Sequence, residues 1–437
     1  MSAHLSPRPA DTRMLANPWM QLTIGVICMA CVANLQYGWT LFVNPIDARY
    51  HWGRAAIQVA FTLFVLLETW LIPVEGYLVD RFGPRYVVIG GALLVTVSWL
   101  VNSVAGSLPV LYFGAALGGI GTGCVYGTCV GNALKWFPGR RGLAAGITAA
   151  GFGAGAALTI GPIASMINSS GYEHAFFVFG LIQGSVVFVM AWAMLVAPDS
   201  LQAATLKPDQ TKRAYTPGEV LRSPVFYVMY LMFVLVSSGG LTMAASMASI
   251  AKDFGIEKVP VQLFGLAMPT LVLALSLNRI CDGAGRPFFG WVSDRIGREA
   301  TMAIAFMIGA GMLFALDSYG NDPLAFVLLT AGYFGVYGQI FSLFPATQGD
   351  TFGGKFATAN AGMLYTAKGT GALLVPLAAS IAKSEGWGMI FTITMCCNLV
   401  AALLAVFVLK PLRDRHFAQS GTTSAAALEV GSTRRTT

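Results

Sequence analysis

Charged residues are scarce in this sequence: Asp, Glu, Lys and Arg make up only 11% of 437 residues, whereas 56% are hydrophobic. A water-soluble chain of this length needs far more charge to cover its surface. The shortage therefore excludes an ordinary soluble protein, and the net charge of +7 does not indicate nucleic acid. We expect an integral membrane protein that contacts the lipid bilayer and has no nucleic-acid partner.

Sequence patterns typical of enzymes are also scarce. The seven cysteines lie in apolar stretches, and the Cys28-x-x-Cys31 spacing falls in the middle of one, without the strand context of a redox motif. Two glycine-rich stretches, 118–123 and 151–155, lack the Gly-Lys-Ser/Thr sequence of a phosphate-binding loop and are better explained by close helix packing. We expect no catalytic site, no metal and no cofactor, and therefore not an enzyme.

Apolar segments of roughly 20 residues recur along the whole chain, and each is long enough to cross the hydrocarbon core of a bilayer as a helix. The first segment is too long for the apolar part of a signal peptide, and residues 1–17 are polar. The sequence predicts an all-α polytopic membrane protein with twelve transmembrane helices. Their predicted ranges are 19–43, 58–78, 87–105, 109–135, 143–167, 174–197, 225–250, 261–290, 300–317, 323–345, 358–382 and 388–409.

The longest polar stretch inside the chain, 198–224, falls near its middle and separates the sixth predicted helix from the seventh. We interpret it as a cytoplasmic linker between two bundles of six helices, at 19–197 and 225–409. Residues 1–18 form a short N-terminal segment. The polar, Ser/Thr/Ala-rich tail at 410–437 is predicted to be disordered.

Lys and Arg are distributed unevenly over the two sides that this topology predicts. Nineteen of the 27 fall on the side that holds both termini, five on the other side and three within helices. Positively charged loops stay in the cytoplasm. We therefore expect both termini in the cytoplasm of, most simply, a bacterial inner membrane.

A loop motif occurs twice, after the second and the eighth predicted helices. The two copies are Gly76-x-x-x-Asp80-Arg81-x-Gly83-x-Arg85 and Gly290-x-x-x-Asp294-Arg295-x-Gly297-Arg298. Each copy has a glycine that permits close helix packing, an acidic residue that can form an ion pair across a gate, and a glycine turn. A repeat of this kind indicates that the two halves are pseudo-repeats of one another.

This repeated motif resembles the signature loop of the major facilitator superfamily. The resemblance implies two six-helix bundles that rock around a central substrate site, with the repeated loops acting at the gate. A secondary transporter is the implied function.

Five ionisable residues lie within the predicted helices: Glu68, Arg279, Asp282, Arg286 and Lys368. Charges at bilayer depth cost a few kcal/mol each, and by default they indicate a functional site. Arg279, Asp282 and Arg286 fall within about 60° on one helix face, and Asp282 and Arg286 are spaced to form an ion pair. A purely structural ion-pair cluster remains the alternative, above all for Arg279, which Asp282 could simply neutralise.

The five charges sum to +1, which suits an anion, and Arg is the residue that binds a carboxylate through two hydrogen bonds. Aromatic and amide side chains in other helices could line the site. Tyr365 lies three residues before Lys368, so the two share one helix face. The lining candidates are Gln36, Tyr37, Trp39, Tyr126, Tyr333, Tyr337, Phe341 and Tyr365.

Five segments narrow the resemblance further. They are Gln36-Tyr37-Gly38-Trp39, Gly123-Cys124-Val125-Tyr126-Gly127, Trp136-Phe137-Pro138-Gly139-Arg140-Arg141, Gly285-Arg286-Pro287-Phe288-Phe289-Gly290 and Ala367-Lys368. These resemble the oxalate–formate antiporter family over essentially all the predicted helices. The resemblance implies that Arg286 and Lys368 hold the carboxylate, and that Gln36, Tyr37, Tyr126, Tyr337, Phe341 and Tyr365 surround it.

The chain departs from that family at several positions. Phe341 stands where a Tyr is expected, Tyr337 and Tyr365 where Trp is expected, and Glu68 where an amide is expected. Asp282, four residues before Arg286, is similar to the arrangement of proton-coupled monocarboxylate transporters.

Three functions therefore remain open: exchange of oxalate- or formate-like anions, proton-coupled symport of a monocarboxylate such as lactate or pyruvate, and an anion-binding membrane sensor. In the transport hypotheses, Asp282, Glu68 and Arg279 couple protons or compensate charge. The chain is expected to act as a monomer.

Overall fold

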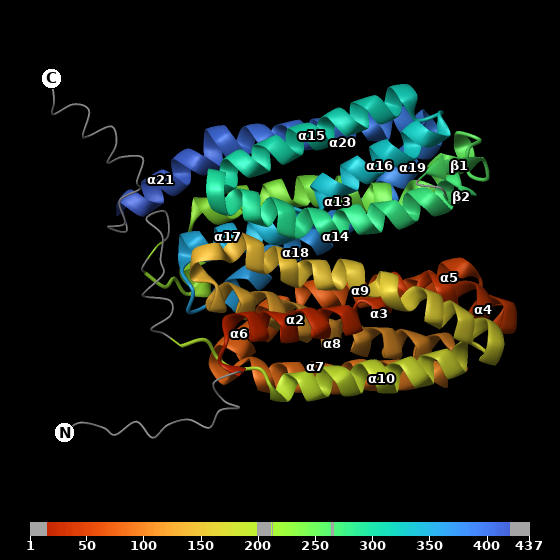
Figure 1. Cartoon of the computed structure of the whole chain (residues 1–437), viewed down its shortest axis with the longest axis horizontal. Helices are drawn as coiled ribbons and strands as arrows, with labels where there is room; N and C mark the ends of the chain where they lie inside the picture. The colour runs from red at the N-terminus through yellow and green to blue at the C-terminus, as the bar shows by residue number, and fades with distance from the viewer. Residues whose placement is uncertain (1–14, 199–210, 212, 264–265, 420–437) are drawn as a thin grey trace.

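The computed structural model describes residues 15–198, 211, 213–263 and 266–419. Its helices run along the long axis of the molecule in two stacked layers (Figure 1). The red-to-yellow layer holds α2 to α10 and the green-to-blue layer holds α13 to α21. Each layer corresponds to one half of the chain, so the two pseudo-repeats lie side by side across one long interface.

The first half begins and ends its helices with residues suited to those positions. Pro occupies the first turn of α2, α7 and α8, where its missing N–H has no partner to lose. Gly83 and Gly171, both at positive φ, end α6 and α9. The helices are α2 (Pro18–Val32), α3 (Asn34–Tyr37), α4 (Thr40–Tyr50), α5 (Arg54–Trp70), α6 (Ile72–Phe82), α7 (Pro84–Ser103), α8 (Leu108–Trp136), the short 3₁₀ helix η1 (Pro138–Arg140), α9 (Arg141–Ser170) and α10 (Tyr172–Trp192).

The second half follows the short helix α12 (Pro217–Val220). Its elements are α13 (Pro224–Asp253), β1 (Pro260–Leu263), β2 (Leu266–Pro269), α14 (Thr270–Ile296), α15 (Arg298–Tyr319), α16 (Pro323–Tyr337), α17 (Ile340–Phe352), α18 (Ala357–Ala372), α19 (Val375–Glu385), α20 (Trp387–Leu403), the π-helical η2 (Leu404–Leu409) and α21 (Lys410–Gln419). Gly297, the counterpart of Gly83, again stands between two helices at positive φ.

Each of the twelve predicted segments contains helix, although four of them are interrupted. The breaks fall at Ala33 and Gly38–Trp39 in the first segment and at Leu71, Gly338–Gln339 and Leu373–Leu374 in the others, and the second segment bends by 44° between α5 and α6. Within the described residues, eight helices are long and apolar enough to cross a membrane, or nine if that bent pair counts as one. α14 is not among them because it carries Arg279, Asp282 and Arg286.

Two predicted boundaries are wrong. Residues 261–269 were expected to open the eighth helix, but Pro260–Leu263 and Leu266–Pro269 pair as antiparallel strands. Pro269, which would lie inside the predicted helix, disfavours a continuous helix there. The tail was expected to be disordered from residue 410, yet α21 continues to Gln419. Arg413 anchors it by donating to Thr351 Oγ1 at 2.8 Å and by pairing with Glu299. The predictions for residues 1–14, 199–210 and 420–437 lie outside the described residues.

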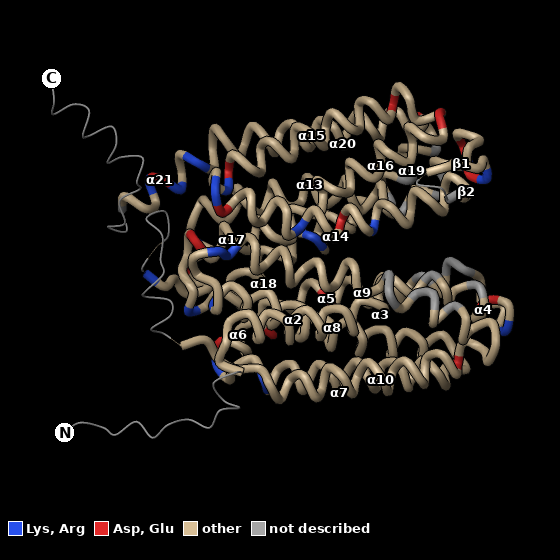
Figure 2. Tube along the Cα trace, in the orientation of Figure 1, with Lys and Arg blue, Asp and Glu red and all other residues tan. Residues whose placement is uncertain are grey.

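The interface between the halves is formed by α5, α6, α8 and α9 on one side and by α14, α17 and α18 on the other. Helix α2 begins, and α21 lies, at the same end of the molecule (Figure 1). We call this end the terminus side. Lys and Arg residues gather along the chain there (Figure 2), as the sequence-based topology predicts.

Candidate functional site

Arg286 lies at the middle of the interface and is only 2% exposed. Its Nη2 is 2.7 Å from Asp282 Oδ2, so the ion pair predicted from the four-residue spacing is confirmed. Its Nη1 donates a hydrogen bond of 2.9 Å to the Ala149 carbonyl of α9, in the other half. The guanidinium therefore connects both halves.

Lys368 of α18 is 3% exposed and faces Glu68 of α5 across the interface. The two charged groups are 3.6 Å apart, which is longer than a normal hydrogen bond. Lys368 Nζ also contacts the Tyr365 hydroxyl at 3.2 Å, as their spacing predicts. Lys368 is thus held more loosely by its carboxylate than Arg286 is by Asp282.

Phe341 of α17 brings the two cations to one place. The Arg286 guanidinium carbon is 4.6 Å, and Lys368 Nζ is 6.0 Å, from the centroid of this ring. Cation–ring contacts contribute about 2 kcal/mol when they are shielded from water. A phenylalanine serves here where the resemblance led us to expect a tyrosine.

The aromatic side chains form a continuous chain of ring contacts around the cations. The ring centroids of Tyr126 and Tyr365 are 4.8 Å apart, and those of Tyr365 and Phe341 are 6.2 Å apart. The Phe341 and Tyr337 centroids are 5.7 Å apart. Tyr126, Tyr337 and Tyr365 are all buried. Most of the predicted lining residues therefore surround Arg286 and Lys368.

Arg279 and Tyr37 lie on the side of the site away from the termini. The Arg279 guanidinium carbon is 4.6 Å from the Tyr37 ring centroid, and both residues are partly exposed. Asp282 pairs with Arg286, and among the described residues Arg279 has no ion pair. The neutralisation of Arg279 by Asp282 that we considered from the sequence is therefore not what the structure has. Gln36 is buried, and its Oε1 has no hydrogen-bond partner in the described part of the chain.

Two members of this site were not recognised from the sequence. Phe152 of α9 bridges Tyr37 and Tyr126, with centroids 5.4 and 5.3 Å away. The Ala149 carbonyl accepts from Arg286. Both lie in a Gly/Ala-rich helix that gave no polar or periodic signal. By contrast, two predicted lining residues lie further from the cations. Tyr333 stacks on Tyr337, and Trp39 lines a separate cavity of the first half.

The two acidic residues of the repeated loops both reach across the interface on the terminus side. Asp80 is 2.6 Å from Lys135 in its own half and accepts from the Ala359 N–H at 3.0 Å. Asp294 accepts from the Gly142 and Leu143 N–H groups at 3.1 and 2.9 Å. In both copies the acidic residue pairs with a cation of its own half, Lys135 or Arg298, and contacts the other half through backbone N–H groups, where the sequence predicted an ion pair across the gate.

The glycines of the repeated loop motif have two different roles. A Cβ on Gly76 would lie 2.7 Å from the Thr358 carbonyl, and one on Gly290 would overlap the Gly142 carbonyl. Gly83 and Gly297 instead provide turns at positive φ. Close approach of the halves therefore depends on Gly76 and Gly290.

The basic residues of the loops behave differently from one another. Arg298 is 4% exposed and lies 2.7 Å from Asp294 and 2.8 Å from Asp350. Arg81, Arg85 and Arg295 instead lie near the aromatic rings of Phe82, Trp192 and Trp291 at 5.4, 5.9 and 3.8 Å.

Asp350 of α17 is the centre of this terminus-side cluster and was missed in the sequence. It is 1% exposed and pairs with Arg141 of the first half at 3.0 Å as well as with Arg298. Arg141 also donates to the Gly349 carbonyl at 2.7 Å. Asp350 falls five residues after the predicted end of the tenth helix, where a solvated charge is ordinary. Its burial depends on the packing of the two halves.

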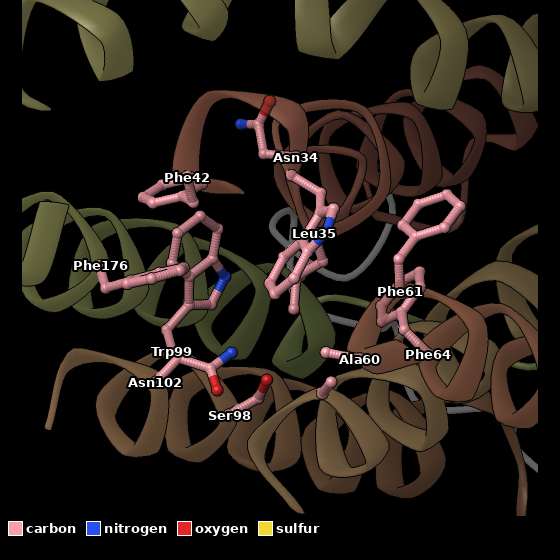
Figure 3. A pocket seen from close by; sticks show the side chains of 12 residues that line it. Asn34, Leu35, Phe42, Ala60, Phe61, Phe64, Ser98, Trp99, Asn102 and Phe176 are labelled. Carbon is pink, nitrogen blue, oxygen red and sulfur yellow. The ribbon is translucent and has the colours of Figure 1, made fainter. Parts of the chain in front are cut away.

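A cavity of about 20 Å³, room for about one water molecule, lies inside the first half (Figure 3). Asn34, Trp39, Trp99 and Asn102 are among the residues that line it. All of its walls come from the first half, so it is separate from Arg286 and Lys368.

Comparison with known proteins gives concordant matches. The family model of the Major Facilitator Superfamily matches residues 24–282. The oxalate:formate antiporter of Oxalobacter formigenes is 34% identical over 401 residues, which is 91% of this chain and 93% of that protein. Monocarboxylate transporter 11 of Mus musculus is 26% identical over 60% of this chain and 57% of its own length. The solved proton:xylose symporter XylE superposes with a TM-score of 0.69 at 13% identity, covering 90% of this chain and 96% of its own.

Proposed function

The chain belongs to the major facilitator superfamily, and from this premise we propose that it moves small carboxylate anions by alternating access around Arg286 and Lys368. It is an integral, multi-pass membrane transporter and not an enzyme. Its alternation would consist of rocking of the two layers about the site.

The observation that carries the proposal is the pair of buried cations over one ring. Arg286 and Lys368 come from two helices of the second half, contact Phe341 together and are covered by Tyr126 of the first half. A carboxylate there would gain a fork-shaped donor and a point charge. Because the site spans the interface, an anion bound in it touches both halves.

The present contacts suggest how an anion would enter this site. Lys368 is only loosely held by Glu68 at 3.6 Å, so it is available to a competing carboxylate. Arg286 would retain its ion pair with Asp282 through Nη2. Its Nη1, which now donates to the Ala149 carbonyl, would donate to the anion instead. Replacing that carbonyl by a carboxylate oxygen would strengthen the hydrogen bond, since charge-assisted bonds are roughly twice as strong as neutral ones.

Exchange of oxalate- or formate-like anions is the mode we propose first. The relative named as an oxalate:formate antiporter is similar over nearly its whole length. In exchange, a bound anion must be present each time the halves move.

Proton-coupled symport of a monocarboxylate is the second mode, and one observation favours it. Asp282 and Glu68 neutralise Arg286 and Lys368, so the four buried charges sum to zero without any cargo. A neutral empty site can close without the desolvation cost of uncompensated charge. The similarity to monocarboxylate transporter 11 agrees with this mode.

We also propose the orientation, assembly and location of the molecule. The terminus side, where Lys and Arg gather, faces the cytoplasm by the positive-inside rule. The chain works as a monomer in the inner membrane of a bacterium. Its partners are the cargo anion and lipid.

Proteoliposome transport distinguishes the two modes. Uptake of labelled oxalate, formate, lactate and pyruvate is measured with and without unlabelled anion inside, and with a pH gradient imposed. Exchange predicts uptake that requires internal anion, whereas symport predicts net uptake driven by the gradient into empty vesicles. Transport of none of the four under either condition would reject the carboxylate proposal.

A further inference from the structure

Glu75 of α6 is a second buried carboxyl group in the first half, and the proposed transport site does not use it. It is only 6% exposed, and among the described residues neither carboxyl oxygen has a hydrogen bond to a nitrogen or oxygen donor, while the Cys124 thiol of α8 lies within reach as a weak donor. Within the same residues it forms no ion pair, in contrast to Glu68, which faces Lys368.

The neighbouring helix α8 provides a slot for this carboxyl. A Cβ on Gly123 would lie 2.8 Å from the Glu68 carbonyl oxygen and 2.6 Å from Glu75 Oε2, so a side chain there would crowd both the backbone of α5 and the carboxyl group. The adjacent Cys124 thiol is a weak hydrogen-bond donor. Val79, one turn along α6, packs with Val87 and Cys124 and closes the slot toward the terminus side.

Among the described residues, the charged groups around the slot offer Glu75 no cation. Glu68 of α5 is itself an acid, and its partner Lys368 is the charge that α18 contributes. Toward the terminus side, Asp80 holds Lys135 of α8 at 2.6 Å. Arg85 of α7 lies near the Trp192 ring. A buried ionised carboxylate without a partner is costly, and such groups take up a proton instead.

The pseudo-repeat shows that the fold does not require an acid at this position. Gly76 and Gly290 occupy equivalent places in the two loop motifs, so the counterpart of Glu75 is Phe289. Phe289 is buried as well. One half thus has an ionisable group where the other half has an apolar ring.

The position of Glu75 connects it to the interface. The next residue, Gly76, packs directly on Thr358 and Ala359 of α18. A cavity of about 240 Å³, lined by Val79, Asp80 and Thr358 among others, begins one turn from Glu75 on the terminus side. Separation of α6 from α18 would therefore expose the region of the slot to water from this side.

We propose that Glu75 is a proton-binding site: its carboxyl holds a proton while the terminus side is closed and releases it to water there when α6 leaves α18. The proton binds and leaves on the same side, so exchange carries no net proton through Glu75. Acid on the terminus side then favours the closed state, and alkali favours the open one. The inference rests on the alternating-access part of the proposed function and not on the cargo.

Infrared difference spectroscopy of the purified protein at neutral pH tests the protonation directly. We expect a carbonyl band of a protonated carboxyl that is lost in Glu75→Gln and kept in the matched Glu68→Gln variant. If Glu75→Gln does not fold, Glu75→Leu, which mimics the apolar counterpart Phe289, takes its place. A spectrum that loses no protonated-carboxyl band in either Glu75 variant would overturn the proposal.

The distance between two spin labels, measured by electron–electron double resonance, tests the coupling of this proton to conformation. Labels at the exposed positions Arg81 and Lys355, on opposite halves of the terminus side, are introduced into a variant without the native cysteines. We expect the distance to lengthen as pH rises, and this shift to be lost in Glu75→Gln. No shift, or the same shift in Glu75→Gln, would refute the coupling. Neither measurement uses a transported anion, so both are independent of the failure or success of the cargo proposal.

Discussion

The two ends of the interface between the halves are held in very different ways. On the terminus side, Asp350 is buried between Arg141 and Arg298, and Asp294 accepts from the backbone of the other half. On the opposite side, Arg279 stacks on Tyr37 and both remain partly exposed. The structure is therefore a state closed at the terminus side, and within the described part of the chain the contact at the other end is much weaker.

The difference indicates where free energy is required for transport. Removing one partner of a buried ion pair destabilises by about 3–5 kcal/mol, whereas an exposed cation–ring contact contributes about 0.5–1 kcal/mol. Opening the terminus side must therefore be compensated by new contacts, such as solvation of the freed charges and an anion held between the halves. Breaking the Arg279–Tyr37 contact at the opposite side costs less.

The largest predicted effect comes from breaking the terminus-side cluster. Asp350→Asn leaves Arg141 and Arg298 without their shared carboxylate, so we expect the open state to become the main population. Spin-label distances between positions 81 and 355 should lengthen accordingly. Asp317→Asn, at an exposed carboxylate of the same half, is the control and should leave the distances unchanged. An Asp350→Asn variant as closed as the wild type would show that this cluster does not hold the closed state.

A smaller effect is expected from a single methyl group at the same end. Gly290→Ala overlaps the Gly142 carbonyl, and overpacking of this kind costs about 1–3 kcal/mol. We expect a partial shift toward the open state in the same distance measurement. Gly311→Ala, in a helix position facing open space, should have no effect. Equal behaviour of the two variants would mean that close contact at Gly290 is not needed for closure.

The smallest effect is predicted at the opposite end. Tyr37→Leu removes the ring beneath Arg279, and we expect a change of about 0.5–1 kcal/mol in the opening of that side. Thermal unfolding should be nearly unchanged, and transport should change by only a few fold. A loss of closure as large as that of Asp350→Asn would remove the difference between the two ends.

Much of the architecture could be predicted from the sequence because it follows from local sequence patterns. The apolar segments, the Lys/Arg bias and the repeated loop each need only neighbouring residues to be recognised. The Asp282–Arg286 and Tyr365–Lys368 contacts also follow from helix spacing alone.

Other features depend on packing between distant segments, and these were missed. Asp350 and Glu75 lie near predicted helix ends, where charges are usually solvated, and their burial results from the approach of other helices. Phe152 and the Ala149 carbonyl enter the site because a glycine-rich helix comes close to α14. The break at Gly338–Gln339 has no proline beside it, whereas Pro73 follows the break at Leu71.

The central claim, that Arg286 and Lys368 bind a carboxylate in competition with Glu68, is tested most directly by calorimetric titration of the purified protein with oxalate, formate and lactate. We predict that Lys368→Ala weakens binding by roughly 30-fold or more, about 2 kcal/mol, and that Glu68→Gln strengthens it because Lys368 loses its competing partner. Lys355→Ala, at an exposed lysine on the terminus side, should bind as the wild type does. Unchanged affinity in Lys368→Ala for an anion that the wild type binds would contradict the account.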